Sequence, residues 1–267
     1  MNAELLLMFT LDCDRAYLYA HPERELTSEQ QCRYENVLAE RVRGVPAQYI
    51  TGHQEFWGMD FIVTPAVLIP RPETEHVVES VLEVRASGFG PRASDFKIVD
   101  VGTGSGCIAL ALAKELPDIQ VYATDISSAA LEVARANAAR HELDSRIQFR
   151  QADLLAGLEN GSFDFVVSNP PYVGESEEDQ VQLEVRKFEP RHAVFSGPAG
   201  VEVIERLIPQ AHATLKPGGW LIMEISGTIA EEVKRSLRDW SEVQIRPDLQ
   251  SIPRVALARK PDTSMQI

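Results

Sequence analysis

The clearest chemistry in this chain lies in Asn169-Pro170-Pro171-Tyr172, which follows the largely apolar run 163–167 and Ser168. Asn169 offers a side-chain carbonyl oxygen, and Pro170 offers a main-chain carbonyl oxygen without an NH that would compete for it. Each proline restricts the residue before it to extended geometry, so both acceptors are largely fixed in advance. Two such acceptors can hold both hydrogens of a planar NH₂ group, while Tyr172 excludes water or orients that group. A structural interpretation stays open, because prolines also end strands.

A second signal is the glycine-rich turn Gly102-Thr103-Gly104-Ser105-Gly106. It lies between the mostly apolar run 96–101 and the Ala- and Leu-rich run 107–116. The pattern predicts a strand, a loop and a helix, in the order that a nucleotide-type site requires. Glycines let the main chain turn sharply and approach a ligand closely. The spacing is GxGxG and differs from the dinucleotide pattern GxGxxG, so this turn alone is weak evidence.

Two acidic residues extend this site. Asp125 ends the apolar run 121–124, near the offset of about 20 residues at which a carboxylate meets ribose hydroxyls. Its alternative role is to cap the helix expected over 127–140, although Ser127 can provide that cap. After the strand expected over 147–150, Asp153 can accept a hydrogen bond from an adenine amino group, with Leu154 packed on the ring. A solvated turn carboxylate beside a core leucine explains that pair as well.

Together these signals favour a ligand that carries ribose and adenine without a chain of phosphates. The sequence has no Walker-type GxxxxGK[ST] motif, and Cys107 follows Gly106 where such a motif would place a lysine. S-Adenosylmethionine fits this description, and S-adenosylhomocysteine would be its product. We therefore expect S-adenosylmethionine as the cofactor.

The motifs from Asp100 to Gly106, at Asp125 and at 169–172 resemble class I S-adenosylmethionine-dependent methyltransferases that act on a planar nitrogen. Further segments resemble the PrmC/HemK family of peptide-chain release factor glutamine methyltransferases, over nearly the whole chain. They are Pro46 to Gly52 with Glu55-Phe56-Trp57-Gly58, Pro70-Arg71-Pro72-Glu73-Thr74-Glu75, and Glu189-Pro190-Arg191. The resemblance implies a Rossmann-like α/β fold: a doubly wound, mostly parallel, seven-stranded methyltransferase sheet with a small N-terminal helical domain.

The resemblance also implies an activity. It is methyl transfer to the side-chain amide nitrogen (N5) of the glutamine in the Gly-Gly-Gln motif of class I release factors. The expected donor site comprises Gly102, Thr103, Gly104, Ser105, Gly106, Asp125, Asp153, Leu154 and Asn169. The glutamine amide is expected to bind at Asn169, Pro170, Pro171 and Tyr172, with Asn169, Pro170 and Tyr172 as the catalytic residues. The family can have an aromatic residue at the position of Leu154, and its members usually have one more helix before the start of this chain.

Two other functions remain as alternatives. A nucleic-acid adenine N6-methyltransferase would present an exocyclic amine of similar geometry on a flipped base. The net charge of -14 argues against it, because affinity for phosphates depends on Lys and Arg. A non-catalytic S-adenosylmethionine-binding protein is the other. We expect class I release factors as partners, and no membrane or direct nucleic-acid partner.

Composition bounds the remaining possibilities. Cys13, Cys32 and Cys107 lack the CxxC spacing of metal sites and are odd in number, so we expect neither a disulfide framework nor a metal. No apolar run is long enough to span a bilayer. The start of the chain has Glu4 but no basic region, which makes it a poor signal peptide. We therefore expect a cytoplasmic enzyme.

Periodicity gives the organisation. Helices are expected over 1–43, with one starting near Thr27, and a hairpin is expected from 61–63 and 67–69. Pro70 and Pro72 alternate with charged residues, which suggests a lid or a plain linker. The predicted units are an N-terminal helical substrate-recognition domain over 1–54, a hairpin linker over 55–75 and a methyltransferase domain over 76–267. Runs 243–245 and 255–258 are expected to pair as an antiparallel sheet edge.

Overall fold

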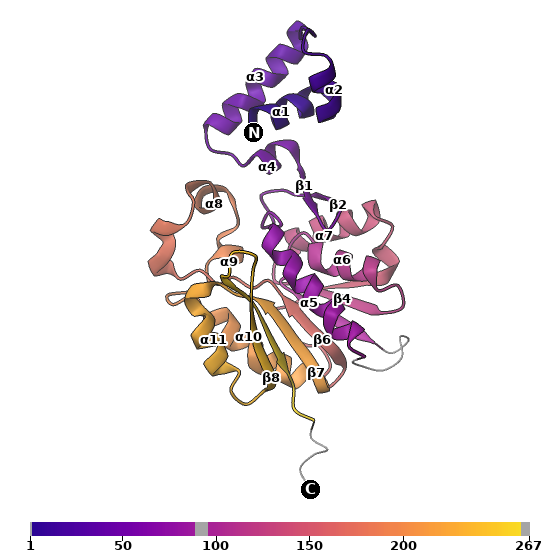
Figure 1. The fold of residues 1–267 in the computed structure, drawn as a ribbon, viewed down its shortest axis with the longest axis vertical. Coiled ribbons are helices and arrows are strands. Elements are labelled where there is room, and N and C mark those ends of the chain that lie inside the picture. Colours follow the sequence, from indigo (N-terminus) through magenta and orange to yellow (C-terminus); the bar gives the residue numbers. More distant parts are fainter. Residues whose placement is uncertain (1, 89–95, 263–267) are drawn as a thin grey trace.

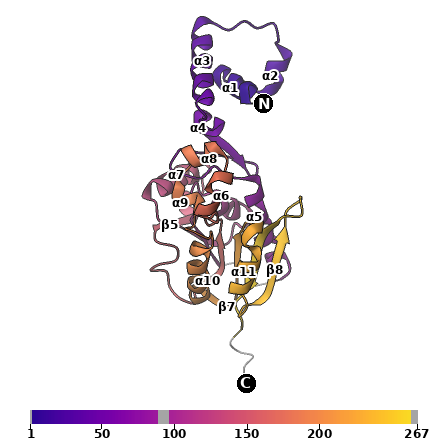
Figure 2. The ribbon, with the colours of Figure 1, turned by 90° about the vertical axis from the view of Figure 1, so that its left-hand side faces the viewer.

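The computed structural model describes residues 2–88 and 96–262, and its first elements are helices that project away from the rest (Figures 1 and 2). They are α1 (Asn2–Leu11), α2 (Arg15–Ala20), α3 (Ser28–Val42) and the short α4 (Ala47–Thr51). The predicted start of α3 is confirmed, because the Thr27 hydroxyl accepts from the Gln30 NH while the Gln30 side chain accepts from the Thr27 NH. This reciprocal capping box satisfies two NH groups that the helix itself leaves unpaired.

A seven-stranded sheet forms the main part of the molecule. Its strands are β3 (Lys97–Val101), β4 (Gln120–Asp125), β5 (Ile147–Gln151), β6 (Phe163–Ser168), β7 (Leu215–Glu224), β8 (Ser241–Pro247) and β9 (Pro253–Arg259). The strand order is β5-β4-β3-β6-β7-β9-β8; neighbours from β5 to β7 are parallel, and β9 is antiparallel to both β7 and β8. The predicted fold class and antiparallel edge are confirmed. β7 includes residues 216–219, and its pairing with β6 shifts register between Phe163 and Phe165.

Helices cover both faces of this sheet. They are α5 (Glu75–Ala86), α6 (Cys107–Glu115), α7 (Ser128–Arg140), α8 (Leu183–Phe188), α9 (Arg191–Val194), α10 (Glu202–Thr214) and α11 (Ala230–Ser236). Within the described ranges, the 3₁₀ turns are η1 (Pro72–Thr74), η3 (Asp144–Arg146), η4 (Glu175–Gln180) and η5 (Gly227–Ile229). Ile98 packs in the core with α5 and α6, whereas the next residue, Val99, packs in the core with α10 and α11. This alternation is what a strand buried on both faces requires.

The strand order places a crossover point at the carboxyl ends of β3 and β6. The chain runs from β3 outward to β5 and then returns to the other side of β3 as β6. Ligands bind such sheets in the crevice at this point. Val101 and Ser168 are paired there, and the Ser168 hydroxyl donates to the Val101 carbonyl at 2.7 Å. The glycine turn and the 169–172 segment therefore leave the sheet side by side.

The predicted hairpin is wrong in position. The structure pairs β1 (His53–Phe56) with β2 (Met59–Ile62) around a two-residue turn, in which Trp57 and Gly58 have φ values of 55° and 65°. Two left-handed residues give the turn that suits the twist of antiparallel strands. The predicted second strand, 67–69, is irregular. A tryptophan at the first turn position concealed the turn, because Asn, Asp or Gly is the usual signal there.

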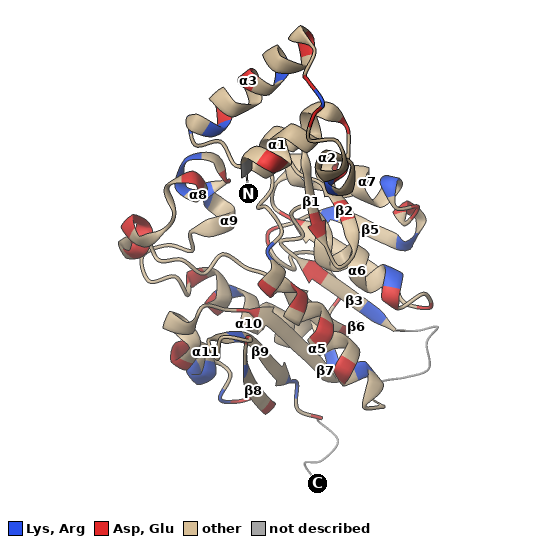
Figure 3. Ribbon diagram, turned by 45° about the horizontal axis from the view of Figure 1, so that its top comes forward, with Lys and Arg blue, Asp and Glu red and all other residues tan. Residues whose placement is uncertain are grey.

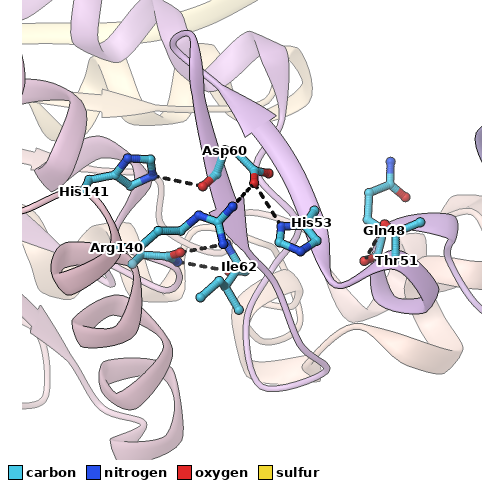
Figure 4. Close-up of polar contacts among 8 residues, drawn as sticks. Gln48, Thr51, His53, Asp60, Ile62, Arg140 and His141 are labelled. Atoms are coloured by element: carbon cyan, nitrogen blue, oxygen red, sulfur yellow. Dashed lines mark hydrogen bonds and ion pairs between the residues drawn. The ribbon is translucent and has the colours of Figure 1, made fainter. Parts of the chain in front are cut away.

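The hairpin is fixed to α7 by polar contacts (Figure 4). The Asp60 carboxylate lies 2.5 Å from an Arg140 guanidinium nitrogen and 3.1 Å from the His53 ring, and the Asp60 carbonyl lies 2.9 Å from the His141 ring. These contacts attach the helical part to the sheet through a short, well-anchored connector. Within residues 2–88 and 96–262, no helix has the length and apolar character needed to cross a membrane.

Candidate functional site

The glycine turn lies directly after β3. Gly102, Gly104 and Gly106 all have positive φ values, and a Cβ on Gly106 would lie 2.7 Å from the Leu110 side chain. Glycine is therefore required at Gly106 both for its conformation and for the packing of α6 against α7. The NH groups of Gly102 and Thr103 donate to the Thr124 carbonyl, which holds the turn against the end of β4.

A cavity of about 290 Å³ opens beside this turn. All but one of the residues predicted to bind the methyl donor line this cavity, and the exception is Gly106. Those that line it are Gly102, Thr103, Gly104, Ser105, Asp125, Asp153, Leu154 and Asn169. Further parts of the wall come from the segment before α5 and from the region of α9 and α10, and include Leu68, Pro70, Thr74, His192, Phe195 and Arg206. One cavity thus brings together motifs that lie far apart in the sequence.

Asp125 is held at the mouth of the turn. Its carboxylate accepts from the Gly104 NH and from the Ser127 NH, both at 2.9 Å. The Ser127 hydroxyl caps α7 by accepting from the Ala130 NH, so the capping role considered for Asp125 belongs to Ser127. Each carboxylate oxygen has further lone pairs. Asp125 can therefore still accept from the hydroxyl groups of a ligand.

The far wall of the cavity contains Asp153 and Leu154. Asp153 forms an ion pair of 2.5 Å with Arg206 of α10. Leu154 has a φ of 54°, a conformation that costs free energy for a leucine and tends to occur at functional sites. Ile126 also lines the cavity and remains 58% exposed, although the sequence prediction missed it. Its signal was its position directly after the carboxylate that ends β4.

Asp100 lies behind the turn. Its carboxyl is fully buried, and burial raises its pKa to about 7 even though a hydrogen bond from Thr103, 2.6 Å long, acts in the opposite direction. Cys107 is buried at the start of α6, and burial raises the pKa of its thiol to about 12. The thiol is therefore un-ionised at neutral pH and packs as a small apolar group.

A smaller cavity of about 160 Å³ adjoins the first. Pro170 and Tyr172 line only the smaller cavity, whereas Asn169 and Pro171 line both. The 169–172 segment thus forms part of the wall between a larger and a smaller cavity. The four residues predicted to bind an amide are together at this wall.

Asn169 and Tyr172 are tied to a buried carboxylate. The Asn169 amide nitrogen donates to the Thr74 hydroxyl at 3.0 Å, and Thr74 donates to Glu224 at 2.6 Å. The Tyr172 hydroxyl donates to the other oxygen of Glu224 at 2.8 Å. Desolvation raises the pKa of Glu224 and, together with that carboxylate, the pKa of Tyr172. The sequence prediction missed both Thr74 and Glu224, although an acid inside the apolar end of β7 was a signal.

The segment expected to be a lid or a linker lines both cavities. Pro70 and Thr74 line the larger one, and Arg71 lines the smaller one. Arg71 pairs with the buried Glu189 at 2.5 Å, and the other oxygen of Glu189 accepts from the Ile69 NH at 3.2 Å. The two family-like segments around Arg71 and Glu189 therefore meet at the site.

Comparisons with known proteins identify the family of this chain. Residues 1–52 match the PrmC N-terminal domain, and residues 87–188 match the methyltransferase small domain. The release factor glutamine methyltransferase of Koribacter versatilis is 57% identical over 98% of this chain and 91% of its own length. The chain belongs to the release factor glutamine methyltransferase family. The enzyme of the same name from Chlorobaculum tepidum is 42% identical over 95% of this chain and 88% of its own.

Solved structures of other proteins support the fold. The hMettl16 catalytic domain aligns with a TM-score of 0.62 at 17% identity and covers 81% of each chain. A methyltransferase from Pyrococcus furiosus aligns with a TM-score of 0.55 at 19% identity, over 85% of this chain and 98% of that one. At such identities the likeness concerns the fold alone. Family membership makes the chain a methyltransferase whose methyl donor is S-adenosylmethionine.

Proposed function

We propose that this enzyme transfers a methyl group from S-adenosylmethionine to the N5 amide nitrogen of the glutamine in the Gly-Gly-Gln motif of class I release factors. The observation that carries the proposal is the place of Asn169 in the wall between the two cavities, with its amide nitrogen already bonded to Thr74. Its carbonyl oxygen is then the end left to accept from a substrate amide. The substrate is proposed from the names of the relatives, which are release factor glutamine methyltransferases.

The larger cavity suits the methyl donor. Asp125 retains lone pairs for ribose hydroxyls, and Ile126 and Leu154 offer apolar surface for adenine. Arg206, which also lines this cavity, is paired with Asp153, so no cluster of unpaired cations is present for a phosphate chain among the described lining residues. These residues fit an adenosine ligand that lacks phosphates.

The smaller cavity suits the amide. An amide nitrogen is a poor nucleophile, because its lone pair is delocalised into the carbonyl group. Acceptance of its hydrogens by the Asn169 side chain and the Pro170 carbonyl would increase electron density on nitrogen and orient it toward the larger cavity. When bound, S-adenosylmethionine supplies the methyl group from its sulfonium. The amide proton is lost after transfer, so no side chain must act as a strong base beforehand.

We propose domain roles on the same basis. The helical part over 1–54 would recognise the protein substrate, residues 55–75 would connect it, and residues 76–267 would carry out the transfer. The connector includes the hairpin and the segment that lines both cavities, so substrate recognition would be joined directly to the site. Release factors act in translation, which makes the cytoplasm the proposed location and direct nucleic-acid binding unnecessary.

A labelling experiment tests the proposed function. Methyl-labelled S-adenosylmethionine is incubated with the enzyme and either a class I release factor, the same factor with its Gly-Gly-Gln glutamine changed to alanine, or double-stranded DNA. We expect label only in the unaltered release factor. Label in DNA would instead indicate the adenine N6 activity, and label in neither substrate would indicate a donor-binding protein without turnover.

A further inference from the structure

We propose that Glu224 and Thr74 are positioning residues that determine which end of the Asn169 side-chain amide is presented to the substrate. This inference rests on the proposed function, because it concerns how the same site selects an NH₂ group. It assigns a role in the reaction to Glu224, which lies outside the motifs of the sequence, and to Thr74, which lies in the family-like segment 70–75 but had no role assigned to it. The number of hydrogens available in the buried network decides this orientation.

The Thr74 hydroxyl has a single hydrogen to donate. Glu224 lies 2.6 Å away and, when ionised, its carboxylate can only accept, so the Thr74 hydrogen points to Glu224. The Thr74 oxygen must then accept from Asn169, at 3.0 Å. Only the NH₂ end of Asn169 can donate, so Asn169 has one permitted orientation. Its carbonyl oxygen is left for the substrate.

The opposite orientation would defeat the reaction. If the Thr74 hydrogen pointed to Asn169 instead, the Asn169 carbonyl would turn to Thr74 and its NH₂ group would face the substrate. Two NH₂ groups would then oppose each other with no acceptor between them. An ionised Glu224 prevents this reversal before any substrate arrives, which is the kind of preorganisation that lowers the barrier to reaction.

Glu224 also holds Tyr172, at the other end of the 169–172 segment. Its second oxygen accepts from the Tyr172 hydroxyl at 2.8 Å, so one carboxylate on β7 fixes Asn169 through Thr74 and fixes Tyr172 directly. Thr74 and Glu224 are each 1% exposed, at positions 150 residues apart in the sequence. The network therefore joins the segment before α5, the end of β6 and the end of β7.

The chemical environment of Glu224 argues for a role beyond packing. Its neighbours in β7, Leu221, Ile222 and Met223, are fully buried apolar residues. A carboxylate is costly to bury there, and burial raises its pKa while the bonds from Thr74 and Tyr172 and the charge of Arg254 oppose that rise. An apolar residue would fill the position at lower cost, but it could not orient Thr74.

Kinetics of two variants at Thr74 test the proposal. Thr74→Val keeps the shape and removes the hydroxyl, whereas Thr74→Ser keeps the hydroxyl and removes a methyl group. We expect Thr74→Val to lower kcat for release factor methylation about 10- to 100-fold, with the Kd for S-adenosylmethionine within about twofold of wild type. Thr74→Ser should retain most of the turnover. Thr214→Val, at a buried threonine at the end of α10, is the matched control for loss of a buried hydroxyl.

Equal turnover of Thr74→Val and wild type would overturn the proposal, and so would equal losses in Thr74→Val and Thr74→Ser. If Thr74→Val fails to fold, Glu224→Gln takes its place. The glutamine keeps the shape of Glu224 but turns one acceptor into a donor, so kcat should fall about 10-fold or more. Unchanged kcat in that variant would also overturn the proposal.

A second measurement does not depend on the substrate. The chain has five asparagines, so protein labelled with ¹⁵N only in asparagine gives few side-chain amide signals. The Asn169 signal is identified by its loss in Asn169→Ala. One of its amide hydrogens should exchange slowly with solvent in wild type and Thr74→Ser, and rapidly in Thr74→Val. Slow exchange in all three proteins would contradict the positioning role. If wild type shows the expected exchange but labels no release factor, the proposed function fails, while the orientation of Asn169 by Thr74 is still supported.

Discussion

Asn169 is the residue on which turnover should depend most. It lines both cavities, and its loss removes one of the two acceptors proposed for the substrate NH₂ group. We expect Asn169→Ala to lower kcat by roughly 10² to 10³, as loss of one preorganised polar contact does elsewhere. Single-turnover labelling of a release factor measures this. Asn160→Ala, on an exposed turn, is the control, and near-normal turnover of Asn169→Ala would refute its assigned role.

Asp125 should contribute mainly to binding of the methyl donor. Both of its oxygens already hold main-chain NH groups of Gly104 and Ser127, which leaves it oriented toward the donor cavity. We expect Asp125→Ala to weaken binding of S-adenosylmethionine about tenfold or more, because a charge-assisted contact and the support of the turn are lost together. Calorimetric titration with the donor measures this. An unchanged Kd would remove Asp125 from the donor site.

Asp100 should make stability depend on pH. Burial raises the pKa of its carboxyl from 3.8 to about 7. Between these values the folded protein binds one more proton than the unfolded chain, so the free energy of unfolding falls as pH rises, by up to about 1.4 kcal/mol per unit. The fall should end above about pH 7. Urea unfolding of wild type and Asp100→Asn from pH 5 to 8 isolates this group, and a difference between them that is constant with pH would exclude it.

At the scale of elements, Asn137 of α7 joins the hairpin to the glycine turn. Its side chain accepts from the Ile62 NH at 2.7 Å and donates to the carbonyls of Ile62 and Ser105 at 3.0 and 2.9 Å. We expect Asn137→Ala to lower the free energy of unfolding by about 2 to 3 kcal/mol, because buried main-chain groups lose their partners. Donor affinity should fall as well. Asn36→Ala on the exposed face of α3 should change stability by less than about 0.5 kcal/mol.

Elements with local signals were predictable from the sequence, and elements that depend on distant contacts were not. The Thr27 cap, the glycine turn and the parallel strands each have a signal within a few residues of the chain. The hairpin was misplaced because Trp57 occupies a left-handed turn position that rarely contains such a residue. Thr74 and Glu224 were missed because their partnership exists only after β7 and the segment before α5 meet.

At the scale of the whole molecule, charge argues for a protein substrate. Figure 3 shows acidic residues over both the helical part and the α/β part, with basic residues interspersed among them. With a net charge of -14, the surface would repel a phosphate backbone. A protein partner can instead bind where charges of opposite sign face each other locally. The helical part lies beyond the edge of the sheet near α8 and α9 (Figure 1).

A groove lies between the end of α3 and α8. Its basic residues allow a test of whether the helical part contributes to recognition of the release factor. It has a volume of about 610 Å³, and the charged residues that line it are Arg41, Arg43, Glu184 and Lys187. The ion pair between Arg41 and Glu184, 2.8 Å long, joins α3 to α8 within this lining. If the helical part recognises the folded release factor, Arg43→Glu should raise KM for that factor about 3- to 10-fold by weakening electrostatic encounter. It should leave kcat and KM unchanged for a short Gly-Gly-Gln peptide, because such a peptide lacks the rest of the folded factor that the helical part would recognise.

Arg238→Glu makes the same change in net charge at an exposed position after α11, outside the residues that line the groove, and serves as the control. Steady-state kinetics with both substrates, at low and at physiological salt, separate the effects. The increase in KM should shrink at higher salt, because screening weakens exposed charges. Equal effects of Arg43→Glu on factor and peptide would mean that the groove influences the catalytic site itself. Equal effects of Arg43→Glu and Arg238→Glu on the factor would mean that only total charge matters, and the recognition role of the helical part would then be lost.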